Sequence, residues 1–193
     1  NKGELEKALK NELPTLVELK DIRGDLHIHS NYPNEPSHDL GNHTMEDMLH
    51  RAQELGYEYI GFSEHNPSVS KHTEEQIYSI LEKRKHKIEN LNMSIKSIRV
   101  VNLLELDILA SGKLAISNSA LELVDATLVS IHSSFSMNKT DMTKRILEGF
   151  SNPKAKILSH PTGRLLNQRD GYDVDWDALF DFAIKNNKAL EIN

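Results

Sequence analysis

The sequence contains no cysteine, which excludes disulfide bonds and thiolate metal sites. It has no run of about 18 apolar residues, and no charged segment followed by an apolar one opens it. We therefore expect neither a membrane-spanning helix nor a signal peptide, and we expect a reducing, cytoplasmic compartment. Glycine-rich motifs that cradle phosphate groups, such as GxGxxG or a P-loop, are also missing.

An excess of positive charge is missing as well, because the formal net charge is −6. A domain that bound nucleic acid by neutralising phosphates alone would be basic. Any phosphate partner must therefore be met locally, by metal ions or a few arginines, or by a region outside this chain. Histidine, in contrast, is abundant, and ten histidines in 193 residues already favour a metal site.

Strand-like apolar segments alternate with amphipathic helices along most of the chain. The predicted strands are residues 25–29, 57–63, 98–108, 126–132, 155–160 and 188–193. Helices are predicted after Thr44 and Thr73, each of which opens a capping box, and over 141–150 and 175–187. This alternation predicts an α/β fold with a parallel sheet, and about six units favour a closed or nearly closed barrel over an open doubly wound sheet.

Five consecutive predicted strands end in a histidine or a carboxylate. The residues at these ends are His27, His29, Glu64, His65, Glu105, Asp107, His132 and His160. Parallel α/β folds carry their sites at the carboxyl ends of the strands, so we expect these side chains to converge at one rim. Nitrogen and oxygen donors without sulfur suit Zn²⁺, Mn²⁺ or Fe²⁺. The pattern therefore predicts a metal cluster, of which His27 and His29 are the first two ligands.

The loops after these strands offer further candidates. His38 and Asp39 follow the first strand, and we favour Asp39 over His38 as an additional ligand. Arg164 follows His160 closely and is expected to contact a phosphate oxygen with its planar guanidinium, with a surface ion pair as the alternative. His50, His72 and His86 lie in or beside predicted helices and are expected at the surface. His43 adjoins a helix cap and is expected to be structural.

Residues 1–22 differ from the rest of the chain. They predict a short charged helix, a break at Pro14 and a linker, with no core of their own. We expect this segment to be a linker or the end of an upstream domain, and residues 23–193 to form one metal-dependent domain. Because the sequence opens with Asn1 and stops inside a predicted strand, we expect it to be a piece of a longer protein.

Six segments resemble the PHP (polymerase and histidinol phosphatase) domain. They are GDLHIHS (24–30), GYEYIGFSEH (56–65), LLELDIL (103–109), SIHSSF (130–135), SHPTGRLL (159–166) and ALEIN (189–193). The version most similar to them is the C-terminal PHP domain of bacterial and archaeal family X DNA polymerases. LPTLVELKDIRGDLHIHS (13–30) resembles the join between the polymerase and PHP parts, and the segment that runs from HPTGRLL to GYDVDWDAL (160–179) resembles the same subgroup.

The resemblance implies a distorted (β/α)7 barrel, similar to a TIM barrel, that holds two or three divalent ions, with Mn²⁺, Zn²⁺ and Fe²⁺ as candidates. It implies three ligand sets, namely His27, His29 and Glu105, then Glu105, His132 and His160, and finally Asp39 and His65. An Asp-x-His motif on a seventh strand would complete the first and third sets, and this chain stops before it. Two features depart from the family: Glu64 precedes His65 where the family usually has Asp, and an insertion follows the first strand.

The resemblance also implies hydrolysis of phosphate esters and, for the polymerase-linked subgroup, 3′–5′ exonuclease activity with processing of DNA 3′ ends in repair. The corresponding hypothesis is attack of a metal-bridging hydroxide on phosphorus, with Glu105 as the shared ligand and Arg164 orienting the phosphate. The partners would be DNA 3′ ends. Two alternatives stay open: a free-standing phosphatase for small molecules such as histidinol phosphate, and a PHP module without catalysis that braces a polymerase.

Overall fold

The computed structural model describes residues 3–36 and 38–192. Its helices and strands are α1 (Glu4–Leu9), the 3-10 helix η1 (Leu19–Asp21), β1 (Gly24–Ile28), α2 (Met45–Glu54), β2 (Tyr59–Phe62), α3 (Glu74–Ser94), β3 (Arg99–Asp107), α4 (Asn118–Leu121), β4 (Ala126–Ser130), α5 (Lys139–Phe150), β5 (Ala155–Leu158), α6 (Trp176–Lys185) and β6 (Ala189–Leu190).

The six strands form one sheet in which neighbours along the chain are neighbours in space, and every pair is parallel. The predicted α/β class with a parallel sheet is confirmed. Among the described residues β1 and β6 do not pair with each other, so the structure does not show a closed barrel. The two outer strands nevertheless approach one another, because the Nδ1 atom of His27 lies 3.1 Å from Oε1 of Glu191.

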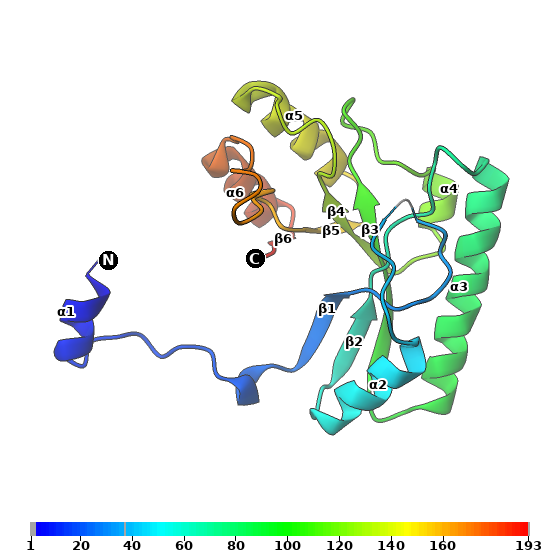
Figure 1. The fold of residues 1–193 in the computed structure, drawn as a ribbon, viewed down its shortest axis with the longest axis horizontal. Coiled ribbons are helices and arrows are strands. Elements are labelled where there is room, and N and C mark those ends of the chain that lie inside the picture. The colour runs from blue at the N-terminus through cyan, green and yellow to red at the C-terminus, as the bar shows by residue number, and fades with distance from the viewer. Residues whose placement is uncertain (1–2, 37, 193) are drawn as a thin grey trace.

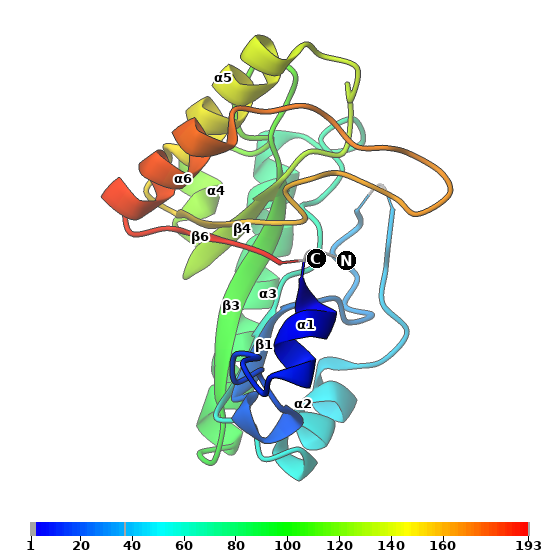
Figure 2. The same ribbon diagram turned by 90° about the vertical axis from the view of Figure 1, so that its left-hand side faces the viewer.

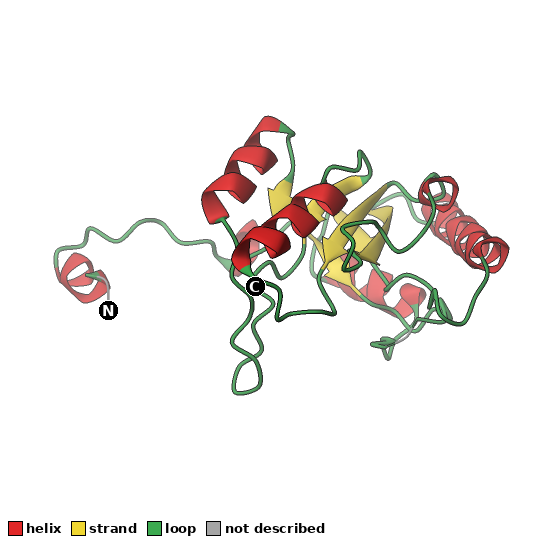
Figure 3. Cartoon of the chain, turned by 90° about the horizontal axis from the view of Figure 1, so that it is seen from above, coloured by secondary structure: helices red, strands yellow, loops and turns green. Residues whose placement is uncertain are grey.

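Helices cover the sheet in two groups, with α2, α3 and α4 beside the first strands and α5 and α6 beside the last ones (Figures 1 and 3). Two apolar clusters lie between the helices and the sheet, and α3 contributes residues to both. Leu49 and Ile88 belong to the cluster under α2 and α3, whereas Ile146 and Leu179 belong to the one under α5 and α6. Burial of these apolar side chains between the helices and the sheet holds the strands in place. It therefore fixes where the carboxyl ends of the strands and the following loops lie.

The two helix starts predicted from capping boxes are confirmed, whereas α5 begins at Lys139, two residues before its predicted start. Thr44 accepts a hydrogen bond from the backbone N–H of Asp47 at 3.1 Å, and Thr73 accepts one from Gln76 at 3.3 Å. The short helix α4 was not predicted, because four residues are too few to show a helical period. The last strand is shorter than predicted, at Ala189–Leu190 within 188–193, and Asn193 lies outside the described residues.

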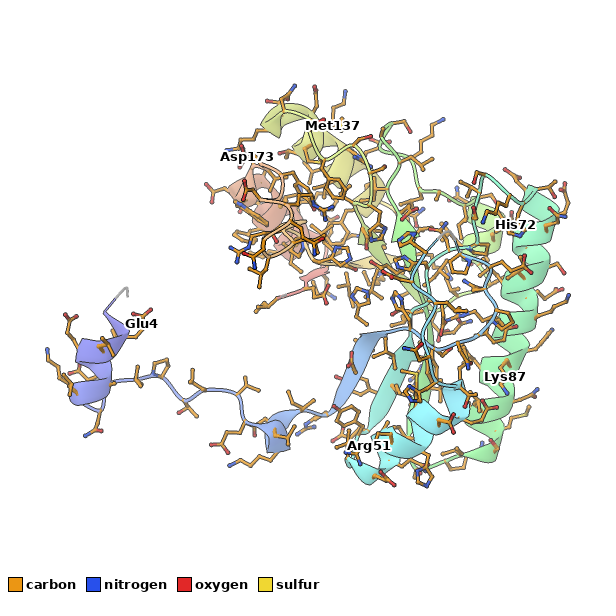
Figure 4. The ribbon with its side chains drawn as sticks, in the orientation of Figure 1. Glu4, Arg51, His72, Lys87, Met137 and Asp173 are labelled. Carbon is orange, nitrogen blue, oxygen red and sulfur yellow. The ribbon has the colours of Figure 1, made fainter. Side chains whose placement is uncertain are left out.

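The N-terminal segment lies apart from the sheet (Figure 1). Helix α1 buries none of its residues, and Glu4 is seen on it well away from the other helices in Figure 4. Its assignment to an upstream domain stays a prediction. None of the described helices has both the length and the apolar composition that crossing a membrane requires.

Candidate metal centre

Glu105, near the end of β3, lies at the centre of the candidate site, and only 1% of its side chain is exposed. Ring nitrogens of five histidines surround its two carboxylate oxygens. Oε2 lies 3.1 Å from His27, 3.1 Å from His29 and 3.3 Å from His65, and Oε1 lies 3.2 Å from His132 and 2.7 Å from His160. Residues that are far apart in the sequence therefore meet around one buried acid.

The parallel sheet explains this convergence. His27 lies in β1, and His29 follows that strand by one residue. His65 follows β2, His132 follows β4 and His160 follows β5. Because all these strands run in the same direction, their carboxyl ends bring the side chains to one edge of the sheet.

Three groups of side chains have ligand atoms within 4.8 Å of one another and could each hold an ion. They are His27 with His29 and Glu105, Glu105 with His132 and His160, and His38 with His65 and His132. The first two match the ligand sets that the resemblance implied. The third contains His38, where we had favoured Asp39.

Asp39 lies at the edge of the third group. Its Oδ2 atom is 3.9 Å from Nε2 of His65, and 79% of its side chain is exposed. The backbone of Asp39 has a φ of 50°, and its carbonyl oxygen lies 3.3 Å from Nδ1 of His29. This turn brings the backbone of Asp39, rather than its carboxylate, to the cluster. The preference for Asp39 stays a prediction, and the geometry favours His38.

The hydrogen bonds within this cluster do not satisfy all of its polar atoms, and this indicates that metal ions fit it. A carboxylate offers about four lone-pair positions, but Glu105 has five imidazoles around it and also accepts a hydrogen bond from Ser130 Oγ at 2.6 Å. Nδ1 of His65 is buried and forms no hydrogen bond with any described residue, although Glu105 is 3.3 Å away. Nitrogen and oxygen atoms that converge in larger number than their mutual hydrogen bonds can satisfy are a donor set that divalent ions bind.

The PHP domain model matches residues 25–193. This chain belongs to the PHP domain family.

Three relatives place this PHP domain among known proteins. It is 33% identical over 178 residues to a Bacillus subtilis protein named DNA polymerase/3′-5′ exonuclease PolX, a match that covers 92% of this chain and 30% of that protein. It is 25% identical to a probable phosphatase of Caldicellulosiruptor saccharolyticus and 29% identical to one of Clostridium acetobutylicum, over 78% of this chain in both cases. These matches cover 59% and 57% of the two phosphatases. The chain therefore spans less than two thirds of the length of each relative.

Two carboxylates of this PHP domain contact candidate ligand residues at atoms that do not face Glu105. Asp107 accepts a hydrogen bond from Nδ1 of His132 at 2.6 Å, which leaves Nε2 of that ring facing Glu105. Glu191 lies 3.1 Å from Nδ1 of His27 and accepts the backbone N–H of His160 at 2.6 Å. Carboxylates of this kind fix the tautomer and orientation of a metal-binding imidazole.

Sequence reasoning found only one of these two carboxylates. Asp107 was noted as a strand-end residue, whereas Glu191 was not singled out. The signal for Glu191 was the same as for the other residues, because it follows β6 by one position. Since β6 is the shortest strand, its end was the hardest to locate from the sequence.

The charge of Glu105 controls the protonation of the cluster. Burial favours the neutral acid, but hydrogen bonds from His132, His160, His27 and His29 outweigh it and hold the pKa of Glu105 far below its usual value. Burial alone would also lower the pKa of His27, yet Glu105 and Glu191 raise it to about 10.

Two further histidines shift in opposite directions. Asp107 and Glu105 overcome the burial of His132 and raise its pKa to about 9. For His65, burial prevails over the attraction of Glu105 and lowers its pKa to about 4. Without metal ions, the PHP domain therefore compensates the buried carboxylate with protons on some of its imidazoles.

We expect metal binding to displace these protons. A histidine must be neutral to bind a metal, and His27 and His132, with pKa values of about 10 and 9, are protonated at pH 7. Release of about two protons makes the apparent metal affinity rise by up to about 100-fold per pH unit, with the rise flattening between pH 9 and 10. Calorimetry in buffers of different ionisation enthalpy measures the proton count. The exposed His50→Gln variant should leave it unchanged, and a count of zero would contradict the expectation.

The remaining histidines lie outside the cluster. His50 and His86 are exposed, as predicted. His72 differs, because only 11% of its side chain is exposed, and the prediction of a solvated position is wrong for it. Its Nδ1 lies 2.9 Å from the carbonyl oxygen of Ser68 and its Nε2 lies 2.7 Å from Glu35, so it ties the loop after β1 to the start of α3, where Figure 4 labels it.

Glu64 supports the centre without joining it. Its carboxylate accepts hydrogen bonds from both the backbone N–H and the hydroxyl of Ser30, and it pairs with Arg84, whose Nε lies 2.8 Å away. Arg84 is completely buried in α3 and also donates to the carbonyl oxygen of Phe62 and to Asn102. Burial would raise the pKa of Glu64, but the charge of Arg84 outweighs it and holds the pKa below its usual value. Glu64 thus links Arg84 of α3 to Ser30 at the end of β1, and Ser30 and Glu64 are each one residue away from a candidate ligand, His29 and His65.

A cavity of about 460 Å³ opens beside the cluster, between the loop after β1 and the loop after β5. Figure 2 shows both loops, blue and orange, extending to the same side of β3. His132 and His160 line the cavity together with Asp39 and Arg164. Among the described residues no carboxylate oxygen lies within 4.0 Å of the Arg164 guanidinium, so the structure does not show the alternative of a surface ion pair.

Proposed function

We propose that this chain is the metal-dependent phosphodiesterase domain of a family X DNA polymerase, and that it removes nucleotides from DNA 3′ ends. The observation that carries the proposal is the meeting of five imidazoles at one buried carboxylate, in a chain 33% identical to a protein named DNA polymerase/3′-5′ exonuclease. The proposal includes two or three divalent ions, of which Mn²⁺, Zn²⁺ and Fe²⁺ suit the donor set.

The proposed ligands are His27, His29, Glu105, His132 and His160, with His65 and either His38 or Asp39 for a third ion. When bound, the ions would neutralise the charge of a phosphate and supply hydroxide near neutral pH. Asp107 and Glu191 hold the rings of His132 and His27, so that their Nε2 atoms stay directed at Glu105. Arg164 lines the adjoining cavity, where its guanidinium can hold two oxygens of a phosphate.

The finer fold assignment belongs to the same proposal. We place residues 1–22 at the join to an upstream polymerase domain and residues 23–193 in the PHP domain. A seventh strand would fit between β6 and β1, because the contact between His27 and Glu191 brings these outer strands together. That strand would complete the distorted barrel and the metal ligands.

The test uses the full-length protein with Mn²⁺ and a 5′-labelled DNA strand. Loss of nucleotides one at a time from the 3′ end is the expected result. Two relatives named probable phosphatases make a small-molecule phosphatase the second candidate. Phosphate release from histidinol phosphate, with the DNA left intact, would favour that candidate. A protein that binds no metal and cleaves neither substrate would be a module without catalysis.

We expect Arg164→Ala to lower kcat/KM for DNA 3′-end removal by about 10- to 100-fold, because a hydrogen bond to a charged group contributes about 1.5–3 kcal/mol. Arg164→Lys should recover only part of the loss, since lysine lacks the planar fork. Steady-state kinetics on a short oligonucleotide measure both effects. The matched control is Arg51→Ala, an exposed arginine that pairs with Glu54, does not line the cavity and is labelled on α2 in Figure 4. Equal kinetics for Arg164→Ala and wild type would exclude a phosphate contact.

A further inference from the structure

A second arginine, Arg169, lines the cavity beside the metal centre, and its side chain is held from two sides. Its guanidinium carbon lies 3.6 Å from the centre of the Phe135 ring, which is the geometry of a cation–π contact. Its Nε donates to the carbonyl oxygen of Gly163 at 2.7 Å. Of the five N–H groups on this guanidinium, the described residues therefore engage only the one on Nε.

The backbone around Arg169 is also fixed. Residues 165 and 169 pair as a short antiparallel bridge, with a hydrogen bond in each direction. Near this bridge, the backbone N–H of Tyr172 donates a hydrogen bond to the carbonyl oxygen of Thr162 at 3.2 Å. The Tyr172 ring packs directly on Gly163, where a Cβ atom would lie 2.4 Å from it, and it stacks at 23° to Phe135. The arginine thus stands on a rigid support, which lowers the entropic cost of using it to bind a ligand.

The charges in the cavity are unusual for this protein. The chain carries a net charge of −6, yet two arginines line the same cavity. Within the part of the chain that the structure describes, neither arginine has a carboxylate oxygen within 4.0 Å. Asp39 is the one acidic group among the described lining residues, and its side chain is mostly exposed. Two cations without acidic partners favour an anionic ligand.

The size and lining of the cavity indicate more than one phosphate. Its volume of about 460 Å³ lies in the range of about 300–1,000 Å³ that holds a whole small ligand. Ile131, Phe135 and Leu165 give it apolar wall alongside the polar groups. His132 and His160 of the candidate metal centre also line it. A phosphate held at the metal centre would therefore leave room, and an arginine, for a neighbouring part of the same substrate.

We propose that Arg169 binds a second phosphate of the substrate, one nucleoside to the 5′ side of the phosphate that is hydrolysed. This inference rests on the proposed function and adds a specificity determinant to it: the site selects a nucleic-acid strand, which carries a phosphate at every nucleoside, over an isolated phosphate ester. Phe135 and Gly163 act as positioning residues for the arginine.

Two dinucleotides that differ by one phosphate test the inference. TpT has a single internal phosphate, and pTpT has in addition a 5′ phosphate. Hydrolysis adds one water across the internal P–O3′ bond, so that TpT yields thymidine and thymidine 5′-monophosphate, and pTpT yields two molecules of thymidine 5′-monophosphate. We expect the full-length wild-type protein with Mn²⁺ to show a kcat/KM for pTpT that is at least about 10-fold higher than for TpT, because one charge-assisted hydrogen bond contributes about that factor to binding.

The variants separate charge from packing. Arg169→Met keeps an unbranched side chain that can pack on Phe135 but has no charge, and it should reduce the preference for pTpT to less than about threefold. Arg169→Lys should keep part of it, and Arg51→Met, which removes one distant charge, should keep all of it. Thermal unfolding checks that the variants are folded. A wild type without preference for pTpT, or an Arg169→Met variant with the full preference, would overturn the inference.

A binding measurement tests the second-phosphate site independently of whether the protein hydrolyses DNA. Calorimetric titration of the metal-free protein with pTpT and TpT measures the contribution of Arg169 to binding in the absence of hydrolysis. Tighter binding of pTpT in wild type, lost in Arg169→Met, would support the second-phosphate site even for a protein that cleaves neither dinucleotide. Equal dissociation constants for the two ligands in wild type would overturn it, even for an active nuclease.

Discussion

Glu105→Gln should abolish phosphoester hydrolysis and remove most of the bound metal. The substitution keeps the size of the side chain but removes the charge that five imidazoles surround. Two of the three candidate ion groups contain Glu105, so a single change affects both. Loss of a residue that only orients a ligand reduces metal affinity or activity by about 10- to 100-fold, and we expect loss of a shared ligand to exceed about 100-fold. Elemental analysis of the purified full-length protein and its exonuclease rate with Mn²⁺ measure the two effects.

A matched control is Glu89→Gln, which removes an exposed carboxylate on α3 that pairs with Lys85 and His86. It should retain the wild-type metal content and rate. Glu105→Ala should behave like Glu105→Gln, because the missing charge, rather than the amide, causes the loss. Wild-type exonuclease rates in either Glu105 variant would show that the carboxylate is not a bridging ligand. Loss of activity with full metal content would instead assign Glu105 a role other than metal binding.

The position of the site could be predicted because it follows from topology. In a parallel sheet the carboxyl ends of all strands lie at one edge, so a histidine or acid at each strand end is enough to locate the cluster. This rule placed His27, His29, His65, Glu105, His132 and His160 together before any geometry was known. It also applies to Glu191, which was missed only because its strand is two residues long.

Loops carry no comparable period, and the less certain predictions fall there. We favoured Asp39 as the ligand, yet the turn at φ 50° brings its carbonyl oxygen to His29 and leaves His38 beside His65. The two ring centres of His38 and His65 lie 4.1 Å apart. Which of two adjacent residues faces inward depends on a single backbone angle, and residue type alone does not determine it.

Arg84 shows a different limit. It lies in a run of charged residues, EKRKHK (82–87), that is typical of a solvated helix face. Its position is nevertheless on the buried stripe of α3, between Leu81 and Ile88 at helical spacing. The helical period agrees with this inward direction, but nothing local indicated the partner, because Glu64 follows β2 and lies 20 residues earlier in the sequence. A buried charge becomes intelligible only when the residue that neutralises it is known.

Arg84→Met should be the most destabilising of the substitutions considered for this ion pair. It leaves the carboxylate of Glu64, which is 1% exposed, without its cation. Removing one partner of a buried pair typically costs about 3–5 kcal/mol of unfolding free energy. The double variant Arg84→Met/Glu64→Gln removes both charges and should recover a large part of that loss. Urea unfolding of wild type, both single variants and the double variant gives the coupling free energy.

The pH dependence provides an independent check of the same pair. In the wild type the folded-state pKa of Glu64 lies below its usual value. The ion pair therefore contributes its full stabilisation above the unfolded-state pKa, and this stabilisation is lost as the pH falls through the folded-state pKa. In Arg84→Met, burial without the cation raises the folded-state pKa, and protonation on acidification relieves the unpaired charge. The difference in unfolding free energy between the two proteins should therefore shrink as the pH falls. A constant difference from pH 7 down to pH 4, or a double variant no more stable than Arg84→Met, would show that the two charges are not coupled. Because Ser30 and Glu64 adjoin His29 and His65, the single variant should also bind metal more weakly than the double variant.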